Sequence, residues 1–186
     1  MTNDKPRAPS RDQSESSPKV GATEFDAVFI EHWQAIYRVL VRLVGDHAEA
    51  EDLALETFWR LYRRPPTHKR RLGGWLYRVA TNLGLNALRA RKRRHAHELD
   101  AGKWAIENSV SDPAHDVIVD EERGQVRDVL SAMDERQARL LLLRYSEMSY
   151  QQLADALGVS VNSIGTLLVR AEREFAKRYR QVTRDE

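Results

Sequence analysis

The sequence predicts an all-α protein made of two small helical domains that are joined by a flexible acidic linker. Apolar residues recur at spacings of three and four along most of the chain, which is the period of an amphipathic helix, and no β-type alternation stands out. The length of 186 residues suits two domains, each near the lower limit for an independent hydrophobic core. The predicted segments are a disordered tail over 1–23, a three-helix domain over 24–95, the linker over 96–116 and a second domain over 117–182.

Charge is distributed unevenly although the net charge is only +2. Twelve Lys/Arg and no Asp or Glu lie between Arg60 and Arg94, whereas residues 24–58 hold eight Asp/Glu against two Lys/Arg. The linker holds five Asp/Glu against one Lys. A protein that only coats nucleic acid would be basic throughout, so this chain is predicted to present different surfaces to different partners.

Several classes of protein are excluded or disfavoured by composition. The chain has no cysteine, which excludes disulfides and thiolate metal sites. Met1 to Lys19 is polar and contains no apolar run like that of a signal peptide, and no window approaches the roughly 18–20 apolar residues that span a bilayer. We therefore predict a soluble, cytoplasmic protein.

The first domain is expected to begin with a helix that ends at Gly45 and carries an apolar face of Phe25, Phe29, Trp33, Ile36, Tyr37, Leu40, Leu43 and Val44. Asp46 is predicted to cap the second helix, with Glu49 completing a capping box. That helix should stop at Pro65-Pro66, because proline cannot continue it. A basic loop over Thr67–Gly74 is expected to follow.

The third helix, WLYRVATNLGLNALRARKRR, is predicted to have two distinct faces. Cations, amides and an aromatic ring fall on one stripe about 60–80° wide: Arg71, Trp75, Arg78, Asn82, Asn86, Arg89 and Arg93. The core face is formed by Leu72, Leu76, Val79, Ala80, Leu83, Ala87 and Ala90. Such a stripe predicts contact with nucleic acid. Trp75 and Tyr77 are candidates for stacking on bases, and packing across the core is the alternative for Trp75.

The second domain contains a pattern typical of a helix-turn-helix, YQQLADALGVSVNSIGTLLV. Asp134 with Gln137, and Ser149 with Gln152, mark two capped helix starts, and Gly158 supplies a left-handed turn. Ser160 is predicted to cap the recognition helix, whose exposed residues would include Asn162, Ser163, Thr166, Val169 and Arg170. This helix is unusually poor in charge, so phosphate contacts must come from Arg170 and Arg173 or from Arg136, Arg139 and Arg144.

Three segments of the chain resemble the bacterial sigma-70 family of RNA polymerase initiation factors: GDHAEAEDLALETFWRLYR, WLYRVATNLGLNALRARKRR and LLLRYSEMSYQQLADALGVSVNSI. The short extracytoplasmic-function (ECF) group fits best, since only a linker separates the region 2-like and region 4-like domains. The likeness covers about residues 24–95 and 117–180. It implies a sigma factor that directs core polymerase to specific promoters and assists promoter melting for transcription initiation.

The resemblance also implies roles for particular residues. Docking on the polymerase clamp helices is assigned to Asp46, Glu49, Asp52, Leu53 and Glu56, with Phe58 as further apolar packing, and the polymerase flap is a second contact. Recognition of the minus-ten element is assigned to Lys69, Arg70, Arg71, Trp75, Arg78, Asn82, Asn86, Arg89 and Arg93. The minus-thirty-five element is assigned to Ser160, Asn162, Ser163, Thr166, Arg170 and Arg173. The further partner implied is an anti-sigma factor.

The recognition helix departs from the pattern of the family. Gly165 and Leu167 stand where the family often has a Lys and an Arg, and Glu172 replaces another basic residue. The alternatives to a sigma factor are a stand-alone helix-turn-helix regulator and a protein-interaction module that has lost promoter reading. The sequence indicates neither a cofactor nor an enzyme, because the acidic helix is accompanied by no nucleophile, Gly-rich phosphate loop or oriented His. His95 and His97 point apart on a helix, which disfavours a metal site.

Overall fold

The computed structural model describes residues 22–67, 72–100, 117–146 and 148–184. All regular structure within these ranges is helical, which confirms the predicted all-α class. The helices are α1 (Ala22–Val44), α2 (His47–Arg63), α3 (Leu72–Asp100), α4 (Val117–Ala132), α5 (Glu135–Arg144), α6 (Tyr150–Leu157) and α7 (Val161–Val182).

The first two helices begin and end where local chemistry predicts. Gly45 has a φ of 77°, a left-handed value that ends α1, and Asp46 then caps α2 by accepting a hydrogen bond of 2.7 Å from the backbone N–H of Glu49. The predicted capping box is incomplete, however. The Glu49 carboxylate lies 3.3 Å from Arg91 of α3, so it ties two helices together instead of returning to the cap.

The third helix is longer than the sequence pattern predicts. α3 begins at Leu72, so the last three residues of the predicted loop Thr67–Gly74 are helical, while 68–71 lie outside the described residues. It continues to Asp100, so that helix and not linker covers 96–100. The rest of the predicted linker, 101–116, and the predicted tail up to residue 21 also lie outside the described residues.

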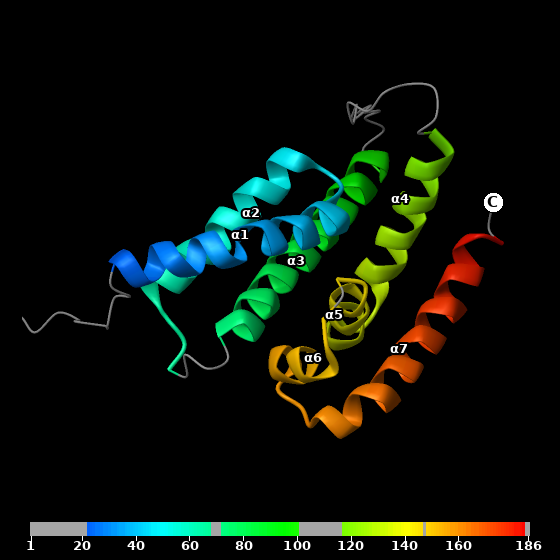
Figure 1. Cartoon of the computed structure of the whole chain (residues 1–186). Helices are drawn as coiled ribbons and strands as arrows, with labels where there is room; N and C mark the ends of the chain where they lie inside the picture. The colour runs from blue at the N-terminus through cyan, green and yellow to red at the C-terminus, as the bar shows by residue number, and fades with distance from the viewer. Residues whose placement is uncertain (1–21, 68–71, 101–116, 147, 185–186) are drawn as a thin grey trace, which may run out of the picture.

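The helices pack in layers around α3 (Figure 1). α1 and α2 contact each other and cover one side of α3, whereas α4, α5 and α6 contact it from the other side. α7 lies at the outer edge, where it packs against α4, α5 and α6. The third helix is thus the contact surface between the two halves of the chain.

This position explains why the predicted core face of α3 is only partly correct. Leu76 and Ala80 are fully buried as predicted, but Leu72, Val79, Leu83, Ala87 and Ala90 are half-buried. Leu85 and Leu88, which the single-face pattern omits, are buried. One hydrophobic cluster runs from Ile36 and Leu40 of α1 through α3 to Val129, Leu130 and Leu141 of the second half. A helix that is packed on two sides cannot show one clean apolar stripe.

The helix-turn-helix forms as expected, with one exception. Ser149 and Gln152 make both hydrogen bonds of a capping box, and Asp134 accepts from the N–H groups of Arg136 and Gln137. Gly158 has a φ of 67° at the end of α6, and a second cluster that includes Leu153 and Ile164 joins the two helices. Ser160 occupies the N-cap of α7, but its side chain makes no capping hydrogen bond.

Within the described ranges, no single helix is long and apolar enough to cross a membrane. α6 and α7 taken together pass a test of length and composition, but the pair is bent by 85°. The same part of the chain contains no group of three or more His, Cys, Asp or Glu side chains that could hold a metal ion.

Candidate nucleic-acid and protein interfaces

Two aromatic residues near the start of α3, one of them on the polar stripe, pack inward. Trp75 and Tyr77 are both half-buried and contact the large core cluster, and Tyr77 also contacts the helix-turn-helix cluster. Burial raises the pKa of the Tyr77 hydroxyl, because desolvation disfavours the phenolate. Of the two roles left open for Trp75, the structure therefore supports packing against the core.

Asn82, at the centre of the stripe, is engaged by the second half of the chain. Arg139 of α5 donates a hydrogen bond from Nη2 to the Asn82 side-chain oxygen and another to the Glu135 carboxylate. Arg139 is only 8% exposed. Burial lowers the pKa of its guanidinium and the neighbouring Arg78 lowers it further, whereas Glu135 opposes both effects. The amide oxygen of Asn82 is thus occupied by a cation from another helix.

Arg89 meets the same neighbouring elements about two turns further along α3 than Asn82. Its Nε atom donates to the backbone carbonyl of Ser131 at 3.1 Å, and its Nη2 atom donates to that of Met133 at 3.2 Å. The Glu135 carboxylate lies 3.9 Å away, and Lys92 approaches Asp128 at 3.8 Å. These contacts involve the end of α4, the start of α5 and the junction between them, so Arg89 is also engaged by the second half of the chain.

The other described residues of the predicted minus-ten set are accessible to solvent, although Arg78 lies close enough to Arg139 to affect its pKa. Arg78, Asn86 and Arg93 are exposed, whereas Lys69, Arg70 and Arg71 lie outside the described residues. Arg91 points toward the first two helices, where it donates to the Val44 carbonyl at 3.3 Å and pairs with Glu49. The stripe is therefore divided into a covered part and an exposed part.

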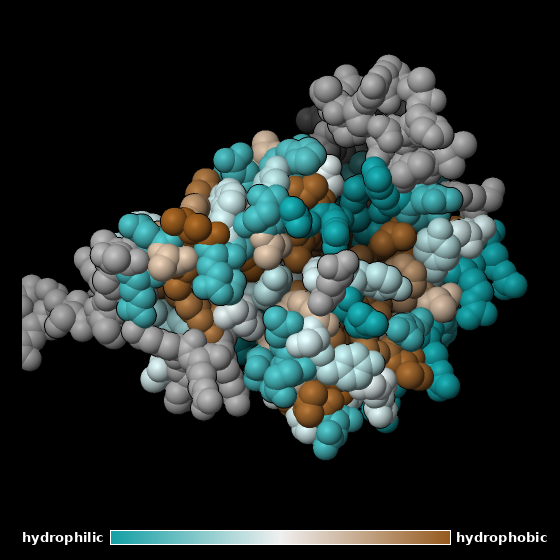
Figure 2. All heavy atoms as spheres, in the orientation of Figure 1, coloured by the Kyte–Doolittle hydropathy of each residue, from teal (hydrophilic) through white to brown (hydrophobic). Residues whose placement is uncertain are grey.

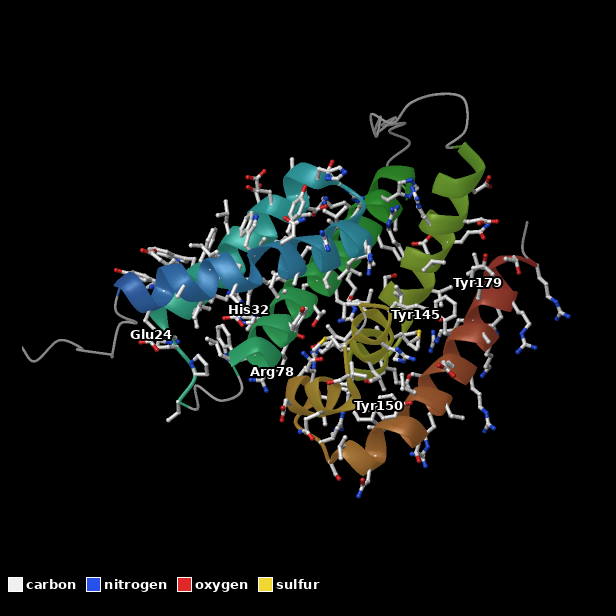
Figure 3. All side chains as sticks on the ribbon, viewed as in Figure 1. Glu24, His32, Arg78, Tyr145, Tyr150 and Tyr179 are labelled. Atoms are coloured by element: carbon white, nitrogen blue, oxygen red, sulfur yellow. The ribbon has the colours of Figure 1, made fainter. Side chains whose placement is uncertain are left out.

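The start of α3 meets α6 at very short range. A Cβ atom added at Gly74 would lie 3.0 Å from the backbone nitrogen of Ala156 and 3.1 Å from the carbonyl carbon of Asp155. Elsewhere the two halves fit less closely, because a pocket of about 520 Å³ opens between α1 and the second half. Arg42 donates to the carbonyl of Tyr145 at this pocket, where Figure 3 labels Tyr145. The interface combines one tight contact with an unfilled space.

The acidic face of α2 is largely accessible. Asp46 and Asp52 are exposed, while Glu49, Leu53 and Glu56 are half-buried. Glu56 pairs with Arg60 at 2.8 Å. The expectation for Phe58 is wrong, because this ring is 1% exposed and packs against Phe29 and Trp33 in the core.

Two apolar residues that the sequence pattern did not single out are exposed on the face of α2 where Phe58 was expected. Leu55 is 48% exposed and Trp59 is 53% exposed, and they are four residues apart on the outer face of α2. Trp59 stacks with Tyr62 and lies 6.0 Å from the Arg63 guanidinium. Their signal was present in the sequence, because both fall outside the arc of Ala50, Ala54, Phe58 and Leu61 that forms the buried face.

The helix-turn-helix presents its predicted residues to solvent. Asn162, Ser163 and Thr166 are exposed at the start of α7, as are Ser160 at the cap and Arg170 and Arg173 further along. Val169 is also exposed, with 45% of its surface accessible. The structure thus provides a polar, uncharged helix start that is exposed to solvent.

Comparison with known proteins matches both halves of the chain to one family. The model for sigma-70 region 2 matches residues 28–94, and the model for sigma-70, region 4, matches residues 123–175. The ECF RNA polymerase sigma factor SigM of Bacillus subtilis is 26% identical over 163 residues, which cover 87% of this chain and 98% of SigM. SigE of Mycolicibacterium smegmatis, another ECF RNA polymerase sigma factor, is 29% identical, and the match covers 81% of this chain but 60% of SigE.

A similar fold is found in a solved structure of the sigma factor RpoE in complex with the anti-sigma factor NepR from Bartonella quintana. The TM-score is 0.52 at 20% identity, and the match covers 86% of this chain and 98% of that chain. The two matched regions follow one another along the chain and together span most of the described helices. The chain belongs to the sigma-70 family and is an RNA polymerase sigma factor of the ECF group.

Proposed function

We propose that this chain binds core RNA polymerase, directs it to specific promoters and assists the melting of promoter DNA. The observation that carries the proposal is the combination, in one chain, of an accessible acidic face on α2 with a cationic and amide-bearing stripe on α3. A stand-alone regulator needs only its helix-turn-helix and has no use for the first of these surfaces. We assign polymerase docking and minus-ten recognition to residues 24–100, and minus-thirty-five recognition to 117–182.

Docking on the polymerase clamp helices is assigned to α2. Asp46, Asp52 and Glu56 supply carboxylates, and the exposed Leu55 and Trp59 supply apolar surface between them. Aromatic residues that are surrounded by polar groups are typical centres of binding energy at protein interfaces. A contact of the second half with the polymerase flap would hold the two halves apart on the enzyme.

Capture of the minus-ten strand is assigned to α3, with Asn82 as a base-reading amide and its cations as phosphate contacts. An amide can pair with a base edge, and a cationic track offsets the cost of unstacking bases. In the closed arrangement described above, Arg139 occupies the oxygen of Asn82. We infer that α5 leaves α3 before this strand is captured, so that docking on polymerase and strand capture are coupled.

The helix-turn-helix is assigned to the minus-thirty-five element, with the start of α7 in the major groove. We assign no catalytic activity to the chain and place it in the cytoplasm with the polymerase that it serves. An anti-sigma factor is the proposed inhibitor, and the likeness to sigma factors with such partners supports it. Its binding would cover the docking face, the promoter-binding face or both.

The test is transcription reconstituted from the full-length chain, core polymerase and a library of randomised promoters. We expect transcripts from a subset of promoters that share two elements, and none when either the chain or the core polymerase is omitted. Specific binding of duplex DNA at nanomolar concentration without polymerase would instead support a stand-alone regulator. Polymerase binding without selection of any promoter would indicate an interaction module.

A further inference from the structure

The exposed face of α7 changes character halfway along the helix. No charged residue lies between Val161 and Val169, whereas the following residues include a row of cations at spacings of three and four: Arg170, Arg173, Lys177, Arg180 and Arg184. All five are exposed. At about 100° per residue they fall within an arc of about 80°, and Asn162 and Thr166 lie in the same arc. We call these five residues the α7 basic row.

The α7 basic row lies opposite the buried face of its helix. Ile164, Leu168 and Ala171 point into the core, and Phe175 packs against it. The nearby acid Glu174 is paired with Arg178 at 2.6 Å, on a different face. In the described part of the chain no carboxylate lies within ion-pair distance of the α7 basic row. Nitrogen-tipped side chains project from the outer side of α7 in Figure 3, and hydrophilic side chains line that edge in Figure 2.

The geometry points to a second, sequence-independent contact: we propose that Lys177, Arg180 and Arg184 bind the phosphates of duplex DNA beside the element that the start of α7 reads. The identity of this partner rests on the proposed function. The row begins with Arg170 and Arg173, which belong to the reading surface already assigned, and extends it by more than two turns.

The length of α7 supports this partner. A helix of 22 residues is about 33 Å long, while the major groove is about 12 Å wide. A helix of this length whose first turns lie in the groove extends beyond the groove, so its later turns lie beside a phosphate backbone if the helix crosses the groove. The α7 basic row, whose last member Arg184 follows the end of the helix at Val182, spans about 21 Å and keeps the angular position of Asn162 and Thr166, so its cations face the side on which the DNA lies.

This arrangement also accounts for the uncharged start of the recognition helix. Helix-turn-helix proteins normally add phosphate contacts from Lys and Arg to their base contacts. Here Gly165 and Leu167 cannot supply them. The α7 basic row provides phosphate contacts from a position further along the helix, and such contacts are electrostatic and carry no sequence information.

The test measures binding of the full-length chain to a 30-base-pair duplex of random sequence, by fluorescence anisotropy over a series of potassium chloride concentrations. The variant is Lys177→Ala, Arg180→Ala and Arg184→Ala together, since alanine preserves the exposed helix. We expect weaker binding and a plot of log K against log salt that is shallower by about two to three units, since each phosphate contact contributes about 0.9. The matched control, Lys177→Arg with Arg180→Lys and Arg184→Lys, keeps the charge and should keep the slope.

An unchanged salt dependence in the alanine variant would overturn the proposal. So would a loss confined to the affinity for core polymerase, because the row would then dock on an acidic protein surface. The row is exposed in the structure as it stands, so this measurement needs no polymerase and is independent of promoter-directed transcription. A chain that fails in transcription but shows the expected slopes would contradict the proposed function alone.

Discussion

Arg139 makes a buried side-chain contact between the two halves of the chain. Its guanidinium bonds to Asn82 on α3 and to Glu135 on its own helix, and its Nε atom has no hydrogen-bond partner in the described part of the chain. Burying a cation is costly unless its hydrogen bonds are satisfied. The hydrogen bonds of Arg139 therefore fix the geometry of the contact but offset only part of the free-energy cost of burying its charge. Such a contact suits an interaction that must be released.

Replacing Asn82 tests the base-reading role at this position. We expect Asn82→Ala to reduce open complexes by about tenfold, which corresponds to about 1.4 kcal/mol and lies within the range for one bidentate base contact. Polymerase association should be unchanged or faster, because Arg139 loses its partner on α3. Fluorescence of 2-aminopurine in the promoter reports strand opening, and a native binding assay reports association.

The useful comparison for that variant is Asn86→Ala, which removes an exposed amide one turn further along α3. A smaller loss of open complexes is expected there. Equal losses of strand opening and polymerase association in Asn82→Ala would contradict the assignment, because they would indicate damage to the domain as a whole.

At the scale of elements, most local signals in the sequence were reliable, although Ser160 makes no capping hydrogen bond and the Glu49 carboxylate pairs with Arg91 instead of returning to its cap, whereas the long-range contacts were not predicted. Asp46, Asp134 and Ser149 cap their helices as predicted, because a cap depends only on residues within one turn. The covering of Asn82 and Arg89 could not be predicted, because their partners lie more than 40 residues away. The inward position of Phe58 also depends on rings of α1 that only the folded chain brings together.

The outer face of α2 yields a prediction of its own. Leu55→Ala with Trp59→Ala should lower the affinity for core polymerase by at least about tenfold, as expected when an aromatic centre of an interface is truncated. The free energy of unfolding should change by no more than about 0.5 kcal/mol per residue, because both side chains lie on the surface. Binding of core polymerase to the immobilised variant measures the affinity, and chemical denaturation measures the free energy of unfolding.

Ile30→Ala serves as the control for these two substitutions. Ile30 is 79% exposed on α1, so Ile30→Ala removes exposed apolar surface from a different helix. A similar loss of polymerase affinity in Ile30→Ala would mean that general surface hydrophobicity, and not the face of α2, determines docking.

At the scale of the whole molecule, the chain is closed around α3. The interface includes the Arg139 and Arg89 contacts, the approach of α6 to Gly74 and the pocket of about 520 Å³. This pocket is open to solvent and is lined by both halves, so the two halves do not meet over the whole of their facing surfaces. In the closed arrangement the two halves thus make specific contacts but leave part of the interface unpacked. The proposed function requires these two halves to separate.

Adding one methyl group at Gly74 should loosen this arrangement. Gly74→Ala places a Cβ atom against the backbone of α6, which cannot move aside as a side chain can, so α6 must give way by a few tenths of an ångström and the closed contact is weakened. We expect a larger radius of gyration by small-angle X-ray scattering and stronger binding of single-stranded DNA by the free chain. The adjacent Gly73→Ala provides a matched control, because its Cβ atom would meet only the His32 side chain at an ordinary 3.5 Å.

Both variants replace a glycine in the same helix, so they gain the same helix propensity of about 1 kcal/mol and differ only in the contact with α6. If Gly74→Ala scattered like the unmodified chain, the close approach of α3 and α6 would not hold the two halves together.

The continuous cluster from Ile36 to Leu141 has a consequence for folding cooperativity. In the closed chain the first three helices and the last four share apolar surface on α3, so neither half reaches its full stability alone. A substitution in α5 therefore also weakens the native state of α1. Once the halves separate, each must rely on its own small core and on the surface that it finds on its partners. Association with a larger assembly then replaces intramolecular burial as the source of stability.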